Sequence, residues 1–169
     1  EVLLDSRINA QSARGCTALY LAAEEGNERI VRLLLNCHAD VTLADSEGST
    51  ALMRACDFGH NPSARTLIEA KANLEATQNK GWTAIMYSAQ NGHDLCLREL
   101  IKAGANVEHT LEDGFNSLLY AAQNGHDLCV RALIEAEANV NATDEAEWTA
   151  LMYASQDGHD LCVRALIEA

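Results

Sequence analysis

Short stripes of apolar residues, separated by polar stretches, recur along the whole chain. One stripe has a large residue followed at i+3 and i+4 by two small ones, as in Leu19, Ala22 and Ala23. Residues at this spacing share one helix face, so we expect a short helix here. The stripe returns at Leu52, Ala55 and Cys56, at Ile85, Ser88 and Ala89, at Leu118, Ala121 and Ala122, and at Leu151, Ala154 and Ser155. Its small members let a neighbouring helix approach to the short end of the usual range of about 8 to 10 Å.

A second stripe of larger apolar residues follows each first stripe after a glycine. In the first copy this stripe is Ile30, Val31, Leu34 and Leu35, and Gly26 precedes it. Glycine readily takes the positive φ that ends a helix, so the sequence predicts a second helix with this stripe as its buried face. A pair of helices this short does not cover its own apolar surface, so it must stack on the next pair.

The stripes belong to a repeat with a period of 33 residues. Gly15, Gly48, Gly81 and Gly114 stand at this step, and Glu147 occupies the fifth position. The phrases that follow are near-copies: GCTALYLAAEEGN, GSTALMRACDFGH, GWTAIMYSAQNGH, GFNSLLYAAQNGH and EWTALMYASQDGH. The period predicts one domain with repeats at 15–47, 48–80, 81–113 and 114–146, a partial repeat at 147–169, and the remnant of a preceding repeat at 1–14. We expect the chain to be a piece of a longer protein.

The outer side of the second helices repeats too. An acid and an arginine four residues apart recur at Glu28 and Arg32, Asp94 and Arg98, Asp127 and Arg131, and Asp160 and Arg164. Each pair is worth about 0.2 to 0.5 kcal/mol and indicates a solvated face. The second copy differs because it contains Pro62, and proline is tolerated in the first helical turn. We therefore expect that helix to start at or next to Pro62.

The phrases around the stripes resemble the ankyrin repeat, whose period is also 33 residues. A Thr-x-Leu phrase opens the first helix, Gly-His precedes the second, and a segment such as 104–107 (GANV) closes the repeat. The resemblance covers residues 15 to 169. It implies an all-α solenoid of stacked helix-turn-helix units with β-turn fingers, and a concave face of fingers and first helices that binds proteins. The usual glycine after the second helix is His38, Lys71 or Glu137 in three copies, and a left-handed conformation there costs on the order of 1 kcal/mol each.

Charge narrows the choice of partner. The 25 acidic and 12 basic residues give a net charge of −13, which repels phosphate backbones and anionic lipids. We therefore expect neither nucleic acid nor a membrane as partner. After residue 102 the only basic residues are Arg131 and Arg164, so a protein partner should be basic.

Apolar runs and cysteine content indicate where in the cell the protein is expected. No apolar run approaches the roughly 18 residues that cross a bilayer, and no signal-peptide pattern opens the chain. Six cysteines in a chain with an ample apolar core favour free thiols in a reducing, intracellular setting, and we expect the cytoplasm.

Large aromatic residues follow the repeat glycine position in three consecutive copies, as Trp82, Phe115 and Trp148. In an ankyrin-like stack this position lies near the base of the finger on the concave side. We expect a ladder of partly exposed rings that anchors a partner. The alternative is that these rings only brace the fingers against one another.

Polar residues surround the expected ladder. The finger tips carry Glu112, Asp113, Asp144, Glu145 and Glu147, which would select a basic peptide or helix. They could equally serve solubility alone. The first helices end in amides that could line the same groove or simply cap the helices; these are Gln90, Asn91, Gln123 and Asn124.

Metal and catalytic chemistry fit the pattern poorly. Three His-x-x-Cys units, for example His93 with Cys96, stand a whole repeat apart, so their ligands do not converge on one zinc ion. The glycines are spaced as turns, and no phosphate-binding phrase occurs. Cys16 and Cys37 are the cysteines expected outside the core, and the pattern places no histidine to activate either. We expect no enzyme, no metal and no cofactor.

The preferred hypothesis is therefore a protein-interaction scaffold that uses its concave face. An alternative makes the repeats a structural spacer or a targeting module for a catalytic domain outside this sequence. A third possibility is end-to-end self-association, because the side of Leu151, Val163 and Ile167 that would face a further repeat is left open.

Overall fold

The computed structural model describes residues 7–169, in which ten helices form five stacked pairs. The first helices of the pairs are α2 (Ala18–Glu24), α4 (Ala51–Asp57), α6 (Ala84–Gln90), α8 (Ser117–Gln123) and α10 (Ala150–Gln156). The second helices are α3 (Glu28–Asn36), α5 (Asn61–Glu69), α7 (Asp94–Lys102), α9 (Asp127–Glu135) and α11 (Asp160–Ile167). The described residues contain isolated β-bridges but no β-strand, which confirms the all-α prediction.

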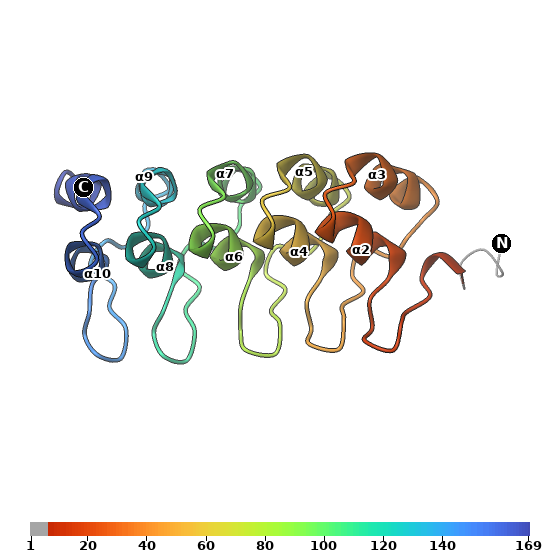
Figure 1. The fold of residues 1–169 in the computed structure, drawn as a ribbon, viewed down its shortest axis with the longest axis horizontal. Helices are drawn as coiled ribbons and strands as arrows, with labels where there is room; N and C mark the ends of the chain where they lie inside the picture. The colour runs from red at the N-terminus through yellow and green to blue at the C-terminus, as the bar shows by residue number, and fades with distance from the viewer. Residues whose placement is uncertain (1–6) are drawn as a thin grey trace.

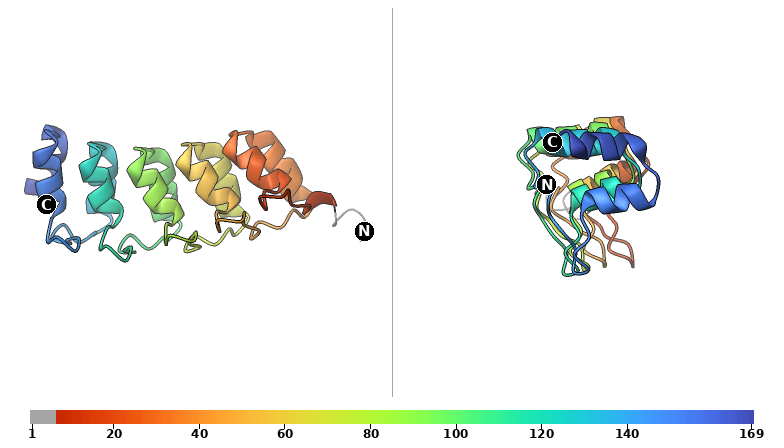
Figure 2. Two further views of the ribbon diagram at one scale, coloured as in Figure 1. Left: turned by 60° about the horizontal axis from the view of Figure 1, so that its bottom comes forward. Right: turned by 90° about the vertical axis from the view of Figure 1, so that its left-hand side faces the viewer.

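The helices form two layers with the fingers projecting from one of them. Each first helix packs on the next first helix, from α2 through α10, and each second helix packs on the next second helix. Figure 1 shows the two rows and the long loops that leave the row of first helices. Viewed along the stack, all the loops hang on the same side (Figure 2, right). We call these loops fingers 1 to 5, residues 11–17, 44–50, 77–83, 110–116 and 143–149, and the surface formed by fingers and first helices the finger face.

Local sequence fixes where the helices begin. In four of the five first helices the residue before the helix accepts a hydrogen bond from the backbone amide at the third helical position; these residues are Thr17, Thr50, Asn116 and Thr149. Such caps satisfy amides that have no partner within the helix. Helix α5 begins at Asn61 with Pro62 in its first turn, which confirms the expected start.

The expected apolar stripes form the core except at the two ends of the stack. At the C-terminal end Leu151 is 37% exposed and Ser155 is exposed, because no further helix pair covers this side of α10 within the described residues. The small residues of the first helices, for example Ala23, Ala55 and Ala89, are fully buried. Ile30 is 46% exposed, although the cysteines at the same position in later copies are buried. The prediction that Ile30 is buried was wrong, because this side of α3 faces the N-terminal end of the stack, where no second helix of the described residues covers it.

Between residues 7 and 169, four residues other than glycine take the left-handed conformation. His38, Lys71 and Glu137, which replace the glycine after the second helix, have φ of 64°, 64° and 62°. Glu147, which replaces the repeat glycine, has φ of 62°. The expected conformations after the second helices are therefore confirmed, and each position holds a strain that glycine would relieve.

The predicted acid and arginine pairs on the second helices form only in part. Arg32 contacts Glu28 at 2.5 Å, and Arg164 lies 4.0 Å from Asp160. Arg98 instead contacts Glu135 of the next second helix at 2.7 Å. The pairing within the helix was wrong for Arg98, because stacking brings a second carboxylate within its reach.

Candidate functional site

The fingers are short turns held together by backbone hydrogen bonds. Bridges close three of them, between Ala44 and Thr50, Thr110 and Asn116, and Thr143 and Thr149. Asp45 and Asp144 act inside their own fingers, because Oδ1 of each accepts two backbone amides of the same turn. Such contacts are typical of aspartate in turns. The fingers are therefore ordered projections beside the first helices.

Aromatic rings form one continuous row along the finger face over repeats three to five. Trp82, Phe115 and Trp148 do not stack on one another directly, because tyrosines stand between them. The centroid of Trp82 lies 5.1 Å from that of Tyr87 and 4.6 Å from that of Tyr120. Phe115 continues the row, 4.8 Å from Tyr120 and 5.4 Å from Tyr153, and Trp148 lies 5.1 Å from Tyr153. We call these six residues the aromatic row.

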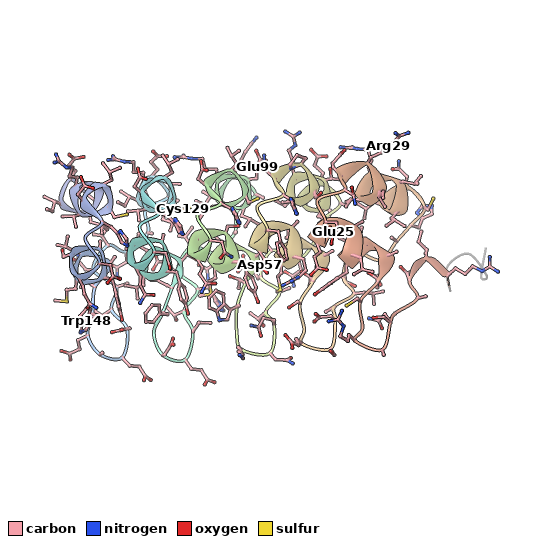
Figure 3. The ribbon with its side chains drawn as sticks, viewed as in Figure 1. Glu25, Arg29, Asp57, Glu99, Cys129 and Trp148 are labelled. Atoms are coloured by element: carbon pink, nitrogen blue, oxygen red, sulfur yellow. The ribbon has the colours of Figure 1, made fainter. Side chains whose placement is uncertain are left out.

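The predicted aromatic residues are partly buried in this row. Trp82, Phe115 and Trp148 each keep an intermediate exposure, while tilted packing on the tyrosines holds them in place. Figure 3 shows Trp148 below α10, where its finger meets the helix layer, and Arg29 and Glu99 on the opposite side of the molecule. The same three rings thus brace the fingers and keep part of their surface exposed.

The three tyrosines of the aromatic row were not predicted from the sequence. Tyr87, Tyr120 and Tyr153 stand six residues after the repeat glycine position, at the same 33-residue step as the aromatics that were singled out. Their recurrence was the available signal. It was overlooked because these residues lie outside the apolar stripe of the first helix.

The acids of the finger tips divide into two groups. Asp113 and Asp144 support their own turns, and Asp144 also accepts a hydrogen bond from the hydroxyl of Tyr153. That bond lowers the pKa of Asp144, and burial raises the pKa of Tyr153 to about 12. The carboxylates of Glu112, Glu145 and Glu147 are exposed, and within residues 7–169 they make no hydrogen bond or ion pair. These three glutamates are therefore free to meet a partner.

The asparagine side-chain amides at the ends of the first helices bond carbonyl oxygens of their own helix, and that of Asn91 also bonds the preceding repeat. Asn91 donates through Nδ2 to the carbonyl oxygens of Asp57 and Tyr87, and Asn124 donates to the carbonyl oxygen of Tyr120 at 2.8 Å. The backbone carbonyls of Gln90 and Gln123 accept bonds from histidines of the following repeats. Asn91 and Asn124 thus have the capping role that was the alternative to binding.

Repeats one and two carry a different cluster on the finger face. Arg54 stands at the sequence position that Tyr87 occupies in the next repeat. Its guanidinium lies 5.8 Å from the ring centroid of Tyr20 and 4.9 Å from that of Phe58. It also contacts carboxylate oxygens of Glu24 and Asp57, each at 2.7 Å. A guanidinium here therefore sits between two rings and two carboxylates.

The His-x-x-Cys units are built into the stack. In each unit Nε2 of the histidine hydrogen-bonds a backbone carbonyl of the preceding repeat, as His93 does with Asp57 at 3.0 Å. The cysteines are buried, and burial raises the pKa of Cys129 to about 12 and that of Cys162 to about 11. Figure 3 shows Cys129 between the two helix layers. Within the part of the chain that the structure describes, no three potential ligand side chains converge.

Cys16 departs from expectation, and Cys37 agrees with it. Cys16 is only 9% exposed, packed at the base of finger 1, while Cys37 is exposed at the end of α3. Placing Cys16 outside the core was wrong, because its position beside the finger is covered even though the residue is small.

None of the helices between residues 7 and 169 is long and apolar enough to cross a bilayer.

Comparisons with protein families agree with this architecture. A family model described as ankyrin repeats in three copies matches residues 1–78 and 71–144, and one described as the ankyrin repeat matches residues 147–169. No curated protein matches the chain.

Proposed function

Because the chain belongs to the ankyrin repeat family, we propose that it binds a basic peptide or helix of another protein on its finger face. Ankyrin repeats are generally protein–protein interaction modules and are typically not catalytic. The observation that carries the proposal is the aromatic row, which joins Trp82 to Trp148 across three repeats through ring contacts of 4.6 to 5.4 Å.

The aromatic row suits an anchor of binding energy. Its rings keep part of their surface exposed yet are fixed by packing, so they lose little freedom when a partner covers them. Partly buried tryptophan and tyrosine are the residues most enriched at the energetic centres of interfaces. The row therefore supports Trp82, Phe115 and Trp148 as contacts of the partner, together with the tyrosines between them.

The charge of the surrounding fingers supports a basic partner. Glu112, Glu145 and Glu147 are exposed on fingers 4 and 5, the fingers that carry Phe115 and Trp148, in a part of the chain that has few basic residues. Carboxylates of this kind raise the rate of encounter and disfavour acidic partners more than they add to affinity. The six cysteines, all within the described residues, are free thiols, in keeping with the intracellular setting that we propose.

A displayed library of random peptides tests the proposal. We expect enrichment of peptides rich in arginine and lysine, with binding that weakens as salt is added. Binding of an enriched peptide should weaken roughly tenfold or more in a Trp82→Ala, Trp148→Ala variant. Since these rings also brace the fingers, a Glu112→Gln, Glu145→Gln, Glu147→Gln variant keeps the packing and should weaken binding as well.

The matched control changes exposed leucines on the second helices, away from the fingers. A Leu95→Ala, Leu128→Ala variant removes two apolar side chains that are 59% and 52% exposed, and it should bind the peptide as the wild type does. Circular dichroism checks that every variant keeps its helices. Selection of acidic peptides, or equal loss in the leucine variant, would contradict the proposal.

We also propose that two copies associate end to end. Met152 of α10 is 51% exposed, whereas Leu119 at the same position in α8 is 1% exposed because α10 covers it. At the other end of the stack Ile30 and Leu33 of α3 are exposed. Both ends of the stack therefore expose apolar side chains. The C-terminal end of one copy would pack on the N-terminal end of another as each repeat packs on the next.

Light scattering over a range of concentrations tests this association. We expect the mass to rise with concentration, and a Met152→Glu, Ile167→Glu variant to remain monomeric because it places charge on the C-terminal end. A strict monomer for the wild type at high concentration would refute the idea.

A further inference from the structure

The junction between fingers 3 and 4 lacks a contact that the other finger junctions have. The amides of Ser46, Asn79 and Glu145 each donate to a carbonyl oxygen at the tip of the preceding finger, at 2.8, 2.8 and 3.0 Å. The equivalent bond would run from the amide of Glu112 to the carbonyl of Lys80. Within residues 7–169 that bond is absent. In Figure 1 the finger before α8 accordingly stands away from the finger before α6.

Leu111 explains why this junction is open. At the same position the neighbouring fingers have Asp45, Gln78 and Asp144, whose side-chain oxygens accept amides of their own turns. Leucine has no acceptor, and its Cδ2 would lie 3.2 Å from a Cβ atom placed on Gly81. The equivalent glycines meet backbone atoms of the next finger instead. The leucine side chain thus fills the space in which, at the other junctions, the backbones of neighbouring fingers are in contact.

The open junction forms a cleft of about 820 Å³ on the finger face. Trp82 and Tyr120, with ring centroids 4.6 Å apart, lie on its helix side. Glu112 and Asp113 line the finger 4 side, and Lys80 lines the finger 3 side. The carbonyl oxygen of Lys80 and the amide of Glu112 are left available by the missing bond.

These groups match an arginine side chain better than a lysine. A guanidinium is planar, stacks on aromatic faces and has five N–H donors, which suits two rings, a carbonyl and two carboxylates. An ammonium is strongly hydrated and offers no flat face. Lys80 is exposed on the opposite wall, and its side chain is flexible. The cleft has two carboxylates against this one ammonium, so its charge is negative.

The protein's own Arg54 shows the same recognition one repeat away. Its guanidinium lies over the rings of Tyr20 and Phe58 and contacts the carboxylates of Glu24 and Asp57. This cluster is on the same finger face, so the fold presents rings and carboxylates at distances that suit a guanidinium.

Resting on the basic partner of the proposed function, we propose that the cleft between fingers 3 and 4 receives one arginine side chain of that partner. The rings of Trp82 and Tyr120 stack on the guanidinium, and the carboxylate of Glu112 and the carbonyl of Lys80 accept its hydrogen bonds. The cleft is thus the position that distinguishes arginine from lysine along the peptide.

Titration with N-acetyl-arginine amide and N-acetyl-lysine amide at constant ionic strength tests the inference by nuclear magnetic resonance. The arginine compound should shift the indole N–H signal of Trp82 more than that of Trp148. It should bind at least about threefold more tightly than the lysine compound, as stacking of a guanidinium on exposed rings allows. Equal shifts at the two indoles, or equal affinity for the two compounds, would overturn the inference.

Two variants link that binding to the cleft. Glu112→Gln should weaken arginine binding, whereas Glu69→Gln on the second helix α5, where the exposed side chain lies outside the fingers, should not. Leu111→Gln restores the side chain that finger 3 uses, so it should close the junction, protect the amide of Glu112 from hydrogen exchange and abolish the preference for arginine. If a selected basic peptide binds at Trp148 while neither compound binds in the cleft, this inference fails and the proposed function stands.

Discussion

Nε2 of His93 lies 3.0 Å from the backbone carbonyl oxygen of Asp57 and so ties the third repeat to the end of a first helix in the second. The same bond recurs at the other three repeat junctions, from His60 to Glu24, His126 to Gln90 and His159 to Gln123. Each histidine ring also packs against the glycine that separates the helices of the preceding repeat. The helical turn and the junction between repeats are therefore one structural unit.

Replacing one of these glycines should cost more where a histidine covers it. A Cβ atom on Gly59 would lie 2.5 Å from Nδ1 of His93, whereas one on Gly158 would have no atom of the described residues within 4 Å. Both glycines have positive φ, 72° and 76°, so both substitutions cost about 1 to 2 kcal/mol in backbone strain. Gly59→Ala should lose about a further 1 to 3 kcal/mol from overpacking.

Urea unfolding of the two alanine variants measures this difference. In a His93→Ala background the extra loss at Gly59 should largely vanish, because the clashing ring is gone. Equal destabilisation by Gly59→Ala and Gly158→Ala would show that the histidine contact does not constrain the turn.

Glycine should stabilise a left-handed position that now holds a glutamate. Glu137 has φ of 62° after α9, and the equivalent residue after α7 is Gly104 with φ of 91°. Glu137→Gly should raise the free energy of unfolding by about 1 kcal/mol by removing strain. Gly104→Ala should lower it by about as much, since no atom of residues 7–169 would clash with the new Cβ. Thermal or urea unfolding gives both values, and a loss of stability in Glu137→Gly would contradict the assignment of strain.

Ser117→Ala should stabilise the fourth repeat. The side chain of Ser117 is fully buried, and its Oγ has no hydrogen-bond partner among the described residues. Alanine occupies this position in the other four repeats, at Ala18, Ala51, Ala84 and Ala150. Removing a buried unpaired hydroxyl should raise the free energy of unfolding by about 1 kcal/mol. Destabilisation of the variant would mean that the hydroxyl makes a bond that matters.

Tyr153→Phe should raise the pKa of Asp144. The hydroxyl of Tyr153 donates to Oδ2 of Asp144, and this bond is the main cause of the lowered pKa. A carboxylate with a lowered pKa in the folded state stabilises the fold above its unfolded pKa and loses that contribution as the pH falls through the folded value. The wild type should therefore lose more stability than the variant on acidification below pH about 4.

The control for this titration is Tyr120→Phe, because in residues 7–169 the hydroxyl of Tyr120 makes no hydrogen bond. A carbon-detected titration of the Asp144 carboxyl group should show a higher pKa in Tyr153→Phe and the wild-type value in Tyr120→Phe. An unchanged titration in Tyr153→Phe would rule out the bond.

Most of the fold follows from sequence because every repeat meets the same neighbours. The stripe that begins at Leu19 predicted a buried helix face, and Pro62 predicted where α5 starts. The left-handed residues were predicted from the missing glycines at His38 and Lys71. Ile30 was misplaced because the argument from periodicity assumes a neighbour on both sides of every repeat.

The site was predictable only in part, because it depends on how fingers pack across repeats. The period identified Trp82, Phe115 and Trp148 but not the tyrosines between them. The open junction depends on one side chain, since Leu111 replaces a residue that accepts backbone hydrogen bonds. Periodicity draws attention to what repeats, whereas this cleft arises where the repeat is broken.

Mapping a bound peptide on the isotope-labelled protein tests the central claim most directly. On addition of a basic peptide selected from the display library, we expect the largest chemical-shift changes at the indole N–H signals of Trp82 and Trp148 and at the backbone amides of fingers 3, 4 and 5. Changes confined to the second helices, around Leu95 and Leu128, with the indole signals unmoved, would contradict the account.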